Sequence, residues 1–129
     1  MRASKPRDVI NPPRELTDRE KTLLEFLLSS PFPGRDELLQ QAEIVKARGT
    51  CLCGCPTIDL TVDPRQAAPA IVRSRVPVEA NGFDTRGDAV LVMLFVDNGY
   101  MSMLEVVAVG QPDVAVFPEI GSLQVTAEQ

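Results

Sequence analysis

The chain of 129 residues is long enough for one domain that buries its own hydrophobic core without disulfides or a metal. Hydrophobic residues make up 44% and charged residues 24%, which is typical of a globular protein and excludes a disordered one. The formal net charge is −5, and the longest apolar run, residues 89–96, is far shorter than the roughly 20 residues that span a membrane.

The N-terminal segment, residues 1–14, contains three prolines and four basic side chains. We expect it to be a flexible leader, followed by a single domain over residues 15–129. The leader lacks the apolar run of a signal peptide. We therefore expect a cytoplasmic protein, in which cysteines stay reduced.

Two helices are predicted next. Thr17 and Glu20 have the spacing of a capping box, in which each side chain bonds a free backbone N–H at the start of a helix. Pro31 disfavours helical geometry in the residue before it, so the first helix should cover residues 17–29. Its apolar face consists of four leucines: Leu23, Leu24, Leu27 and Leu28. A short second helix should begin near Asp36.

From residue 44 onward the pattern changes to that of β-strands. The stretch "TIDLTVD", residues 57–63, alternates apolar and polar side chains, and we pair it antiparallel with residues 43–49. Further strands are predicted by the sequence at residues 75–82, 89–96 and 100–108, with a short last strand within residues 122–125. Pro77 places the strand 75–82 near an edge of the sheet, because proline donates no hydrogen bond.

A tight turn at residues 97–99 should join the strands 89–96 and 100–108 into a hairpin, because Asn and Gly tolerate positive φ angles. The strand 89–96 is apolar on both faces, so we expect a cover over its second face. The alternatives are the C-terminal segment, a curled sheet or a second copy of the chain. Met101 and Met103 are predicted to share one face.

Together these elements predict an α+β fold, with two N-terminal helices packed on one face of an antiparallel sheet of about five strands. The segments "LTDREKTLLEFLL", "FPG", "CGCPTIDL" and "VDNGYMSMLEV" occur in this order within residues 15–127. They resemble a group of small uncharacterised actinobacterial proteins with a C-x-C-G-C-P-[ST] motif. The resemblance implies a similar fold and assigns no activity or site residue.

The most unusual stretch is "CLCGCP", which contains all three cysteines, Cys51, Cys53 and Cys55, between two predicted strands. In an extended strand, residues i and i+2 lie about 6.6–6.8 Å apart. A tetrahedral zinc–thiolate site requires sulfurs roughly 3.8 Å apart. Gly54 supplies the backbone freedom that could bring Cys53 and Cys55 together.

Three interpretations of these cysteines stay open, and the first is that they pack as small apolar side chains in a turn, with no cofactor. The second is a zinc or copper site formed by Cys51, Cys53 and Cys55. Because the chain contains no His, a fourth zinc ligand would be a carboxylate such as Asp59, a water or a thiolate from another chain. Cu(I) accepts two or three thiolates. The third interpretation is a redox pair of Cys53 and Cys55.

The charges are unevenly distributed along the chain. Only one of the 13 basic residues, Arg86, follows Arg75, whereas eight of the 18 acidic residues do. A surface this acidic repels phosphate backbones, so we expect no nucleic-acid partner. We interpret the acidic half as a solvated face, with a patch for a basic protein partner as the alternative. Arg73 and Arg75 are candidate contacts for an anion or a partner, and a surface pair without such a contact is the favoured alternative.

The sequence contains no recognisable catalytic set. Without His, a Ser or Cys nucleophile lacks its usual base, and no glycine-rich phosphate-binding pattern occurs. We therefore predict a small cytoplasmic binding or interaction module, of accessory or immunity type, with an unidentified protein partner and no catalytic activity. The alternative is a thiol-based metal-binding or redox protein centred on the three cysteines, and an enzyme using carboxylates comes third.

Overall fold

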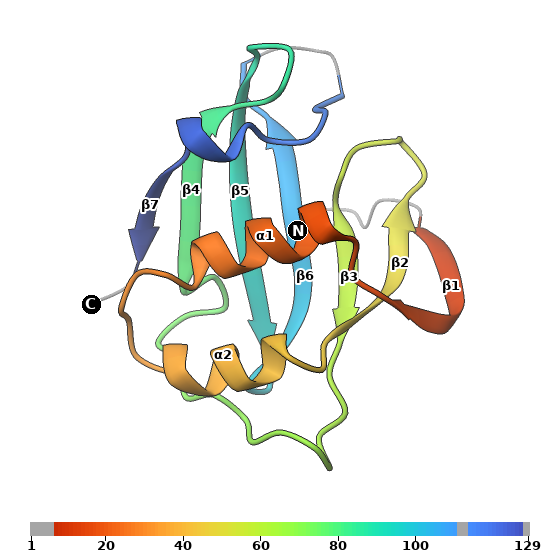
Figure 1. The fold of residues 1–129 in the computed structure, drawn as a ribbon, viewed down its shortest axis with the longest axis vertical. Coiled ribbons are helices and arrows are strands. Elements are labelled where there is room, and N and C mark those ends of the chain that lie inside the picture. The colour runs from red at the N-terminus through yellow and green to blue at the C-terminus, as the bar shows by residue number, and fades with distance from the viewer. Residues whose placement is uncertain (1–6, 111–113, 128–129) are drawn as a thin grey trace.

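The structure is a computed structural model that describes residues 7–110 and 114–127, and it shows one antiparallel sheet and two α-helices (Figure 1). The predicted α+β class with an antiparallel sheet is confirmed, but the described residues form seven strands rather than about five. Their order in the sheet is β1-β2-β3-β6-β5-β4-β7. The elements are β1 (Arg7–Glu15), α1 (Asp18–Leu27), α2 (Arg35–Ala42), β2 (Lys46–Cys51), β3 (Ile58–Thr61), β4 (Val78–Phe83), β5 (Ala89–Asp97), β6 (Tyr100–Ala108), a short 3₁₀ helix (Ile120–Ser122) and β7 (Gln124–Ala127).

The first strand, β1, lies in the segment that was expected to be a flexible leader. That expectation does not hold for residues 7–14, which pair antiparallel with β2, with an irregularity between Val9 and Arg14. The segment is poor in apolar residues because it forms an edge strand whose side chains are mostly exposed. Its backbone hydrogen bonds, rather than a buried face, attach it to the sheet. Residues 1–6 of the expected leader lie outside the described residues.

The first helix starts as predicted. The Glu20 backbone N–H donates to the Thr17 hydroxyl at 3.2 Å, and the Thr17 N–H donates to the Glu20 carboxylate at 2.9 Å. This capping box confirms the predicted N-terminus. Helix α1 ends at Leu27, two residues earlier than predicted. No helix in the described part of the chain is long and apolar enough to cross a membrane.

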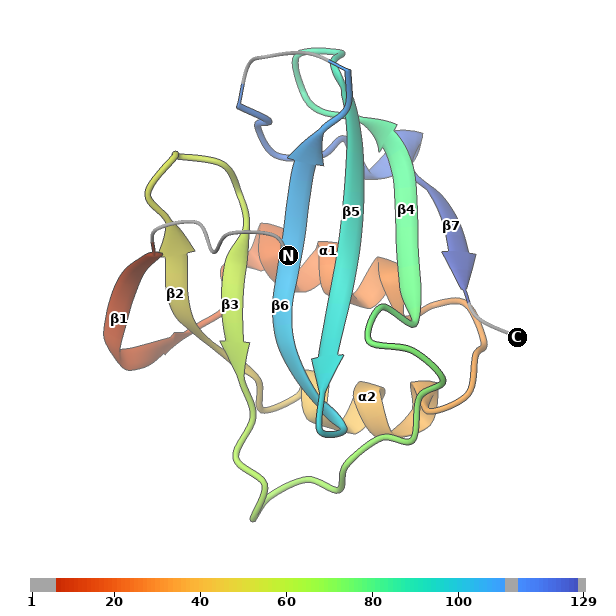
Figure 2. The same cartoon turned by 180° about the vertical axis from the view of Figure 1, so that it is seen from behind.

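Both helices lie on the same side of the sheet (Figures 1 and 2). Leucines of α1 and α2 belong to one buried cluster with inward-facing side chains of the central strands. From β5 these are Val90, Val92, Leu94 and Val96. The core therefore lies between the helices and one face of the sheet, as expected when amphipathic helices and strands bury their apolar sides together.

The hairpin of β5 and β6 is confirmed. Asp97 pairs with Tyr100, and the two residues between them, Asn98 and Gly99, have φ angles of 54° and 85°. Positive φ at both positions is typical of the two-residue turns that match the twist of a hairpin. Strand β4 begins directly after Pro77 and lies between β5 and β7, so the predicted edge position belongs to β7 instead.

The second face of β5 is open in the described structure. Leu91, Met93 and Phe95 point away from the helices and are half-buried. In Figure 2, no helix or strand of the described residues lies over β4, β5 and β6 on this side. The described C-terminal residues, ending in β7, extend the edge of the sheet and do not cover this face.

The two methionines of β6 do not share a face, contrary to the prediction. The register of the hairpin shifts between Phe95 and Val96, so Met101 lies opposite Val96 on the helix side. Met103 lies opposite Phe95 on the open side. The extra residue in β6, Ser102, reverses the alternation of side chains between the two methionines.

Candidate metal centre

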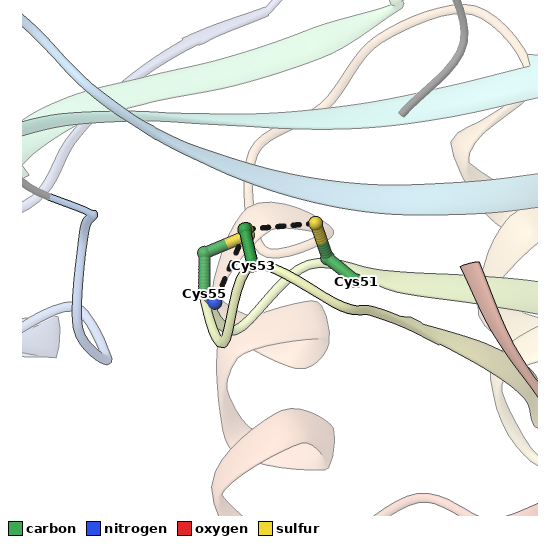
Figure 3. A group of neighbouring side chains, drawn as sticks. All are labelled: Cys51, Cys53 and Cys55. Carbon is green, nitrogen blue, oxygen red and sulfur yellow. Dashed lines mark hydrogen bonds between the residues drawn. The ribbon is translucent and has the colours of Figure 1, made fainter. Parts of the chain in front are cut away.

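Cys51 is the last residue of β2, and Cys53 and Cys55 lie on the turn that connects β2 to β3, in or beside which the cysteines were predicted (Figure 3). The Gly54 backbone N–H donates to the Cys51 carbonyl at 3.2 Å, which closes a turn at the end of β2. Gly54 itself has a φ of 91°, a left-handed conformation that glycine adopts without the steric cost of a Cβ. The chain therefore folds back on itself within the cysteine stretch instead of continuing as an extended strand.

This turn brings all three sulfur atoms together, within 4.8 Å of one another. The Sγ atoms of Cys51 and Cys53 are 2.8 Å apart, and the backbone N–H of Cys55 donates to the Cys53 Sγ at 3.4 Å (Figure 3). The three thiols are free. The separation of more than 6 Å expected for an extended strand is removed by the turn, so the group can hold a metal ion.

The sulfurs differ in their access to solvent. Cys51 and Cys55 are buried, with exposed fractions of 6% and 9%, whereas Cys53 is exposed. Packing as small apolar side chains accounts for the first two cysteines and not for the third. The exposed thiol of Cys53 lies against the buried thiol of Cys51, where an ion arriving from solvent can reach it.

The turn is fixed to the sheet by a residue that the sequence did not single out. Thr57 is 1% exposed, and its hydroxyl accepts from the Val106 N–H at 3.0 Å and donates to the Val106 carbonyl at 3.2 Å. The side chain thereby replaces backbone pairing between the end of the turn and β6. In the sequence, Thr57 is indistinguishable from the polar, outward-facing members of an alternating strand, so no signal could have identified it.

The environment shifts the pKa values of two thiols in opposite directions. Partial desolvation by the neighbouring groups raises the pKa of the Cys53 thiol to about 11 although the side chain is exposed, with further contributions from hydrogen bonds with Cys51 and Cys55 and from the charge of Cys55. Burial also disfavours the Cys55 thiolate, but hydrogen bonds with Thr57, including its backbone N–H, and with Cys53 and Cys51 outweigh it and lower the pKa of that thiol. The Cys55 thiol therefore loses its proton more readily than the Cys53 thiol, and thiols that bind a metal cation release their protons.

The fourth ligand suggested from the sequence is engaged elsewhere. The Asp59 carboxylate accepts from Nε of Arg7 at 3.0 Å, across the sheet from β1. Among the described residues, no Asp or Glu joins the group formed by the three cysteines. The donor set that this part of the chain offers is therefore three sulfurs.

The second candidate site, Arg73 and Arg75, has a different structure from the one predicted. Both residues are exposed and precede β4 in an irregular segment rather than sharing one side of a strand. The Arg75 guanidinium pairs with Asp97 at 2.8 Å and lies over the ring of Phe95. The favoured interpretation was a pair of surface residues, and a contact with an anion or a partner stays a prediction.

No protein-family model, curated protein or solved structure matches this chain. The site is therefore interpreted from its own geometry and chemistry.

Proposed function

We propose that this protein binds a thiophilic metal ion, zinc or copper, through Cys51, Cys53 and Cys55. The observation that carries the proposal is the convergence of three sulfurs to within 4.8 Å on one turn. Thiolate sulfur is a soft ligand suited to Cu(I) and Zn(II). The turn is held by Thr57 on β6, so the ligands are largely in place before an ion arrives.

The proposal implies a reducing compartment, because the thiols must stay free to bind an ion. The cytoplasm provides such conditions, in agreement with the location expected from the sequence. Cys53 lies on the exposed side of the turn, so the ion can enter and leave the site from solvent.

The test is metal analysis of protein purified under reducing conditions, combined with thermal unfolding. We expect about one zinc or copper ion per chain and a melting temperature that falls when a chelator removes the ion, because binding energy is then part of folding energy. A variant with all three cysteines replaced by Ser should retain no ion. A metal-free reduced protein whose unfolding is indifferent to chelators and to added zinc or copper would contradict the proposal and leave packing as the role of the cysteines.

The interaction module predicted from the sequence stays a prediction. Several large apolar side chains are exposed, among them Leu52 in the cysteine turn at 62%. Single exposed apolar residues are normal on protein surfaces and do not identify a partner.

A further inference from the structure

The number of protein ligands discriminates between the two metals of the proposed function. Zinc in structural sites takes four ligands in a tetrahedron, and with three protein ligands it keeps one position open to water or substrate. The described residues offer three sulfurs and no carboxylate beside them, and the whole chain contains no His. A zinc ion on this turn would therefore be left incompletely enclosed by the protein.

The geometry of three sulfurs alone suits an ion that prefers fewer ligands. Three metal–sulfur bonds of about 2.3 Å at 120° separate the sulfur atoms by about 4.0 Å. All three sulfurs already lie within 4.8 Å of one another, and the 2.8 Å contact between Cys51 and Cys53 has to widen. This contact has to lengthen by about 1 Å to reach that separation, and Cys53 can move because it is exposed on the turn.

The burial of the three sulfurs also favours an ion that binds few ligands. Two sulfurs, those of Cys51 and Cys55, are buried against the sheet, and one is exposed. An all-sulfur, partly dehydrated environment favours a soft monovalent ion over a divalent ion that retains a water ligand. Cys51 and Cys55 then act as fixed ligands, and Cys53 acts as the ligand that closes over the bound ion.

We propose that the turn is a three-coordinate, all-thiolate Cu(I) site, with Cys53 as its movable ligand. This inference rests on the proposed function, since it names the ion that the same site takes. It also predicts that one chain is sufficient for binding, because no ligand has to come from a second copy.

The experiment is anaerobic titration of the reduced full chain with Cu(I) in the presence of a competing Cu(I) chelator, followed by X-ray absorption at the copper edge. We expect one copper per chain with three sulfur neighbours. A parallel titration with Zn(II) should give an ion that a chelator removes during gel filtration, whereas Cu(I) is retained.

The variant Cys53→Ser keeps the two buried cysteines and therefore the packing of the turn. We expect it to lower the Cu(I) affinity by about tenfold or more and to reduce the sulfur neighbours from three to two. The matched control is Leu52→Ser, which changes the neighbouring exposed residue of the same turn and should leave the Cu(I) affinity unchanged.

The outcomes separate this inference from the proposed function. Zn(II) retained against the chelator while Cu(I) is lost, or one copper per two chains, would overturn the three-coordinate Cu(I) site and leave metal binding intact. An unchanged Cu(I) affinity in Cys53→Ser would overturn the role of Cys53. Failure to bind either ion would overturn the proposed function together with this inference.

Discussion

The hydroxyl of Thr57 connects the cysteine turn to the sheet, and its removal should weaken both the fold and the site. Thr57→Val keeps the β-branched shape of the side chain and replaces the hydroxyl with a methyl group. The Val106 N–H, which donates at 3.0 Å, and the Val106 carbonyl, which accepts at 3.2 Å, then lose their partner in a buried position. Thr57 is 1% exposed, so water does not easily replace the hydroxyl.

Each buried backbone group left without a partner costs about 1–3 kcal/mol, and the added methyl recovers part of that cost, so Thr57→Val should lose about 2–4 kcal/mol of unfolding free energy. The measurement is urea denaturation of the reduced, metal-free protein. The matched control is Thr61→Val at the other end of β3, where the side chain is half-buried. The control should change the unfolding free energy by about 0.5 kcal/mol or less.

The same variant tests the link between the anchor and the site. Because the turn is then no longer fixed on β6, Thr57→Val should also weaken metal binding by about tenfold or more, whereas Thr61→Val should not. If Thr57→Val unfolds at the same urea concentration as Thr61→Val, the anchoring role of the hydroxyl is refuted.

Two further predictions concern the parts of the fold away from the turn. Gln41 is fully buried and its amide bonds three backbone groups, at 2.9–3.1 Å, so Gln41→Met should lose about 2–4 kcal/mol in urea denaturation. The control is Gln40→Met at the exposed neighbouring residue, and an equal loss of unfolding free energy in the two variants would contradict the reasoning. Asp84 is 2% exposed, and although burial opposes the shift, N–H groups of Val116, Asp88 and Arg86 lower its pKa. The unfolded carboxyl, with a pKa of about 3.9, binds its proton first as the pH falls, so this contribution to stability is present above that value and is lost below it. Asp84→Asn should therefore show a melting temperature that falls less steeply between about pH 5 and pH 3 than that of the original protein, and parallel curves would refute it.

Local sequence signals predicted the individual elements where local chemistry decides the backbone. The capping box of Thr17 and Glu20 defines the start of α1, and Asn98-Gly99 defines the hairpin turn. The boundaries of the strands shifted by a few residues, because pairing with a neighbouring strand decides where a strand ends. The shift of the register at Ser102, which separates Met101 from Met103, has no local signature at all.

The N-terminal segment and strand β4 also show that local sequence signals do not decide where a strand lies in the sheet. Residues 7–14 have the composition of a flexible segment, yet they form β1 because β2 offers them an unpaired backbone edge. Strand β4 is interior although Pro77 indicated an edge, since the proline lies just outside the paired residues. Neither outcome depends on side-chain patterns within the segment itself.

The sequence by itself determined the α+β class, the main hairpin and the location of the cysteines on a turn between two strands. It determined the donor types as well, because a chain without His can offer only sulfur and oxygen ligands on that turn. The tertiary structure decided the distances between the three Sγ atoms. Spacing along the chain does not fix where Sγ atoms point, whereas the turn at Gly54 and the bond of Thr57 to β6 bring them within 4.8 Å. The tertiary structure also decided that Asp59 pairs with Arg7, a residue 52 positions away in the chain, and so left three sulfurs as the candidate ligands among the described residues.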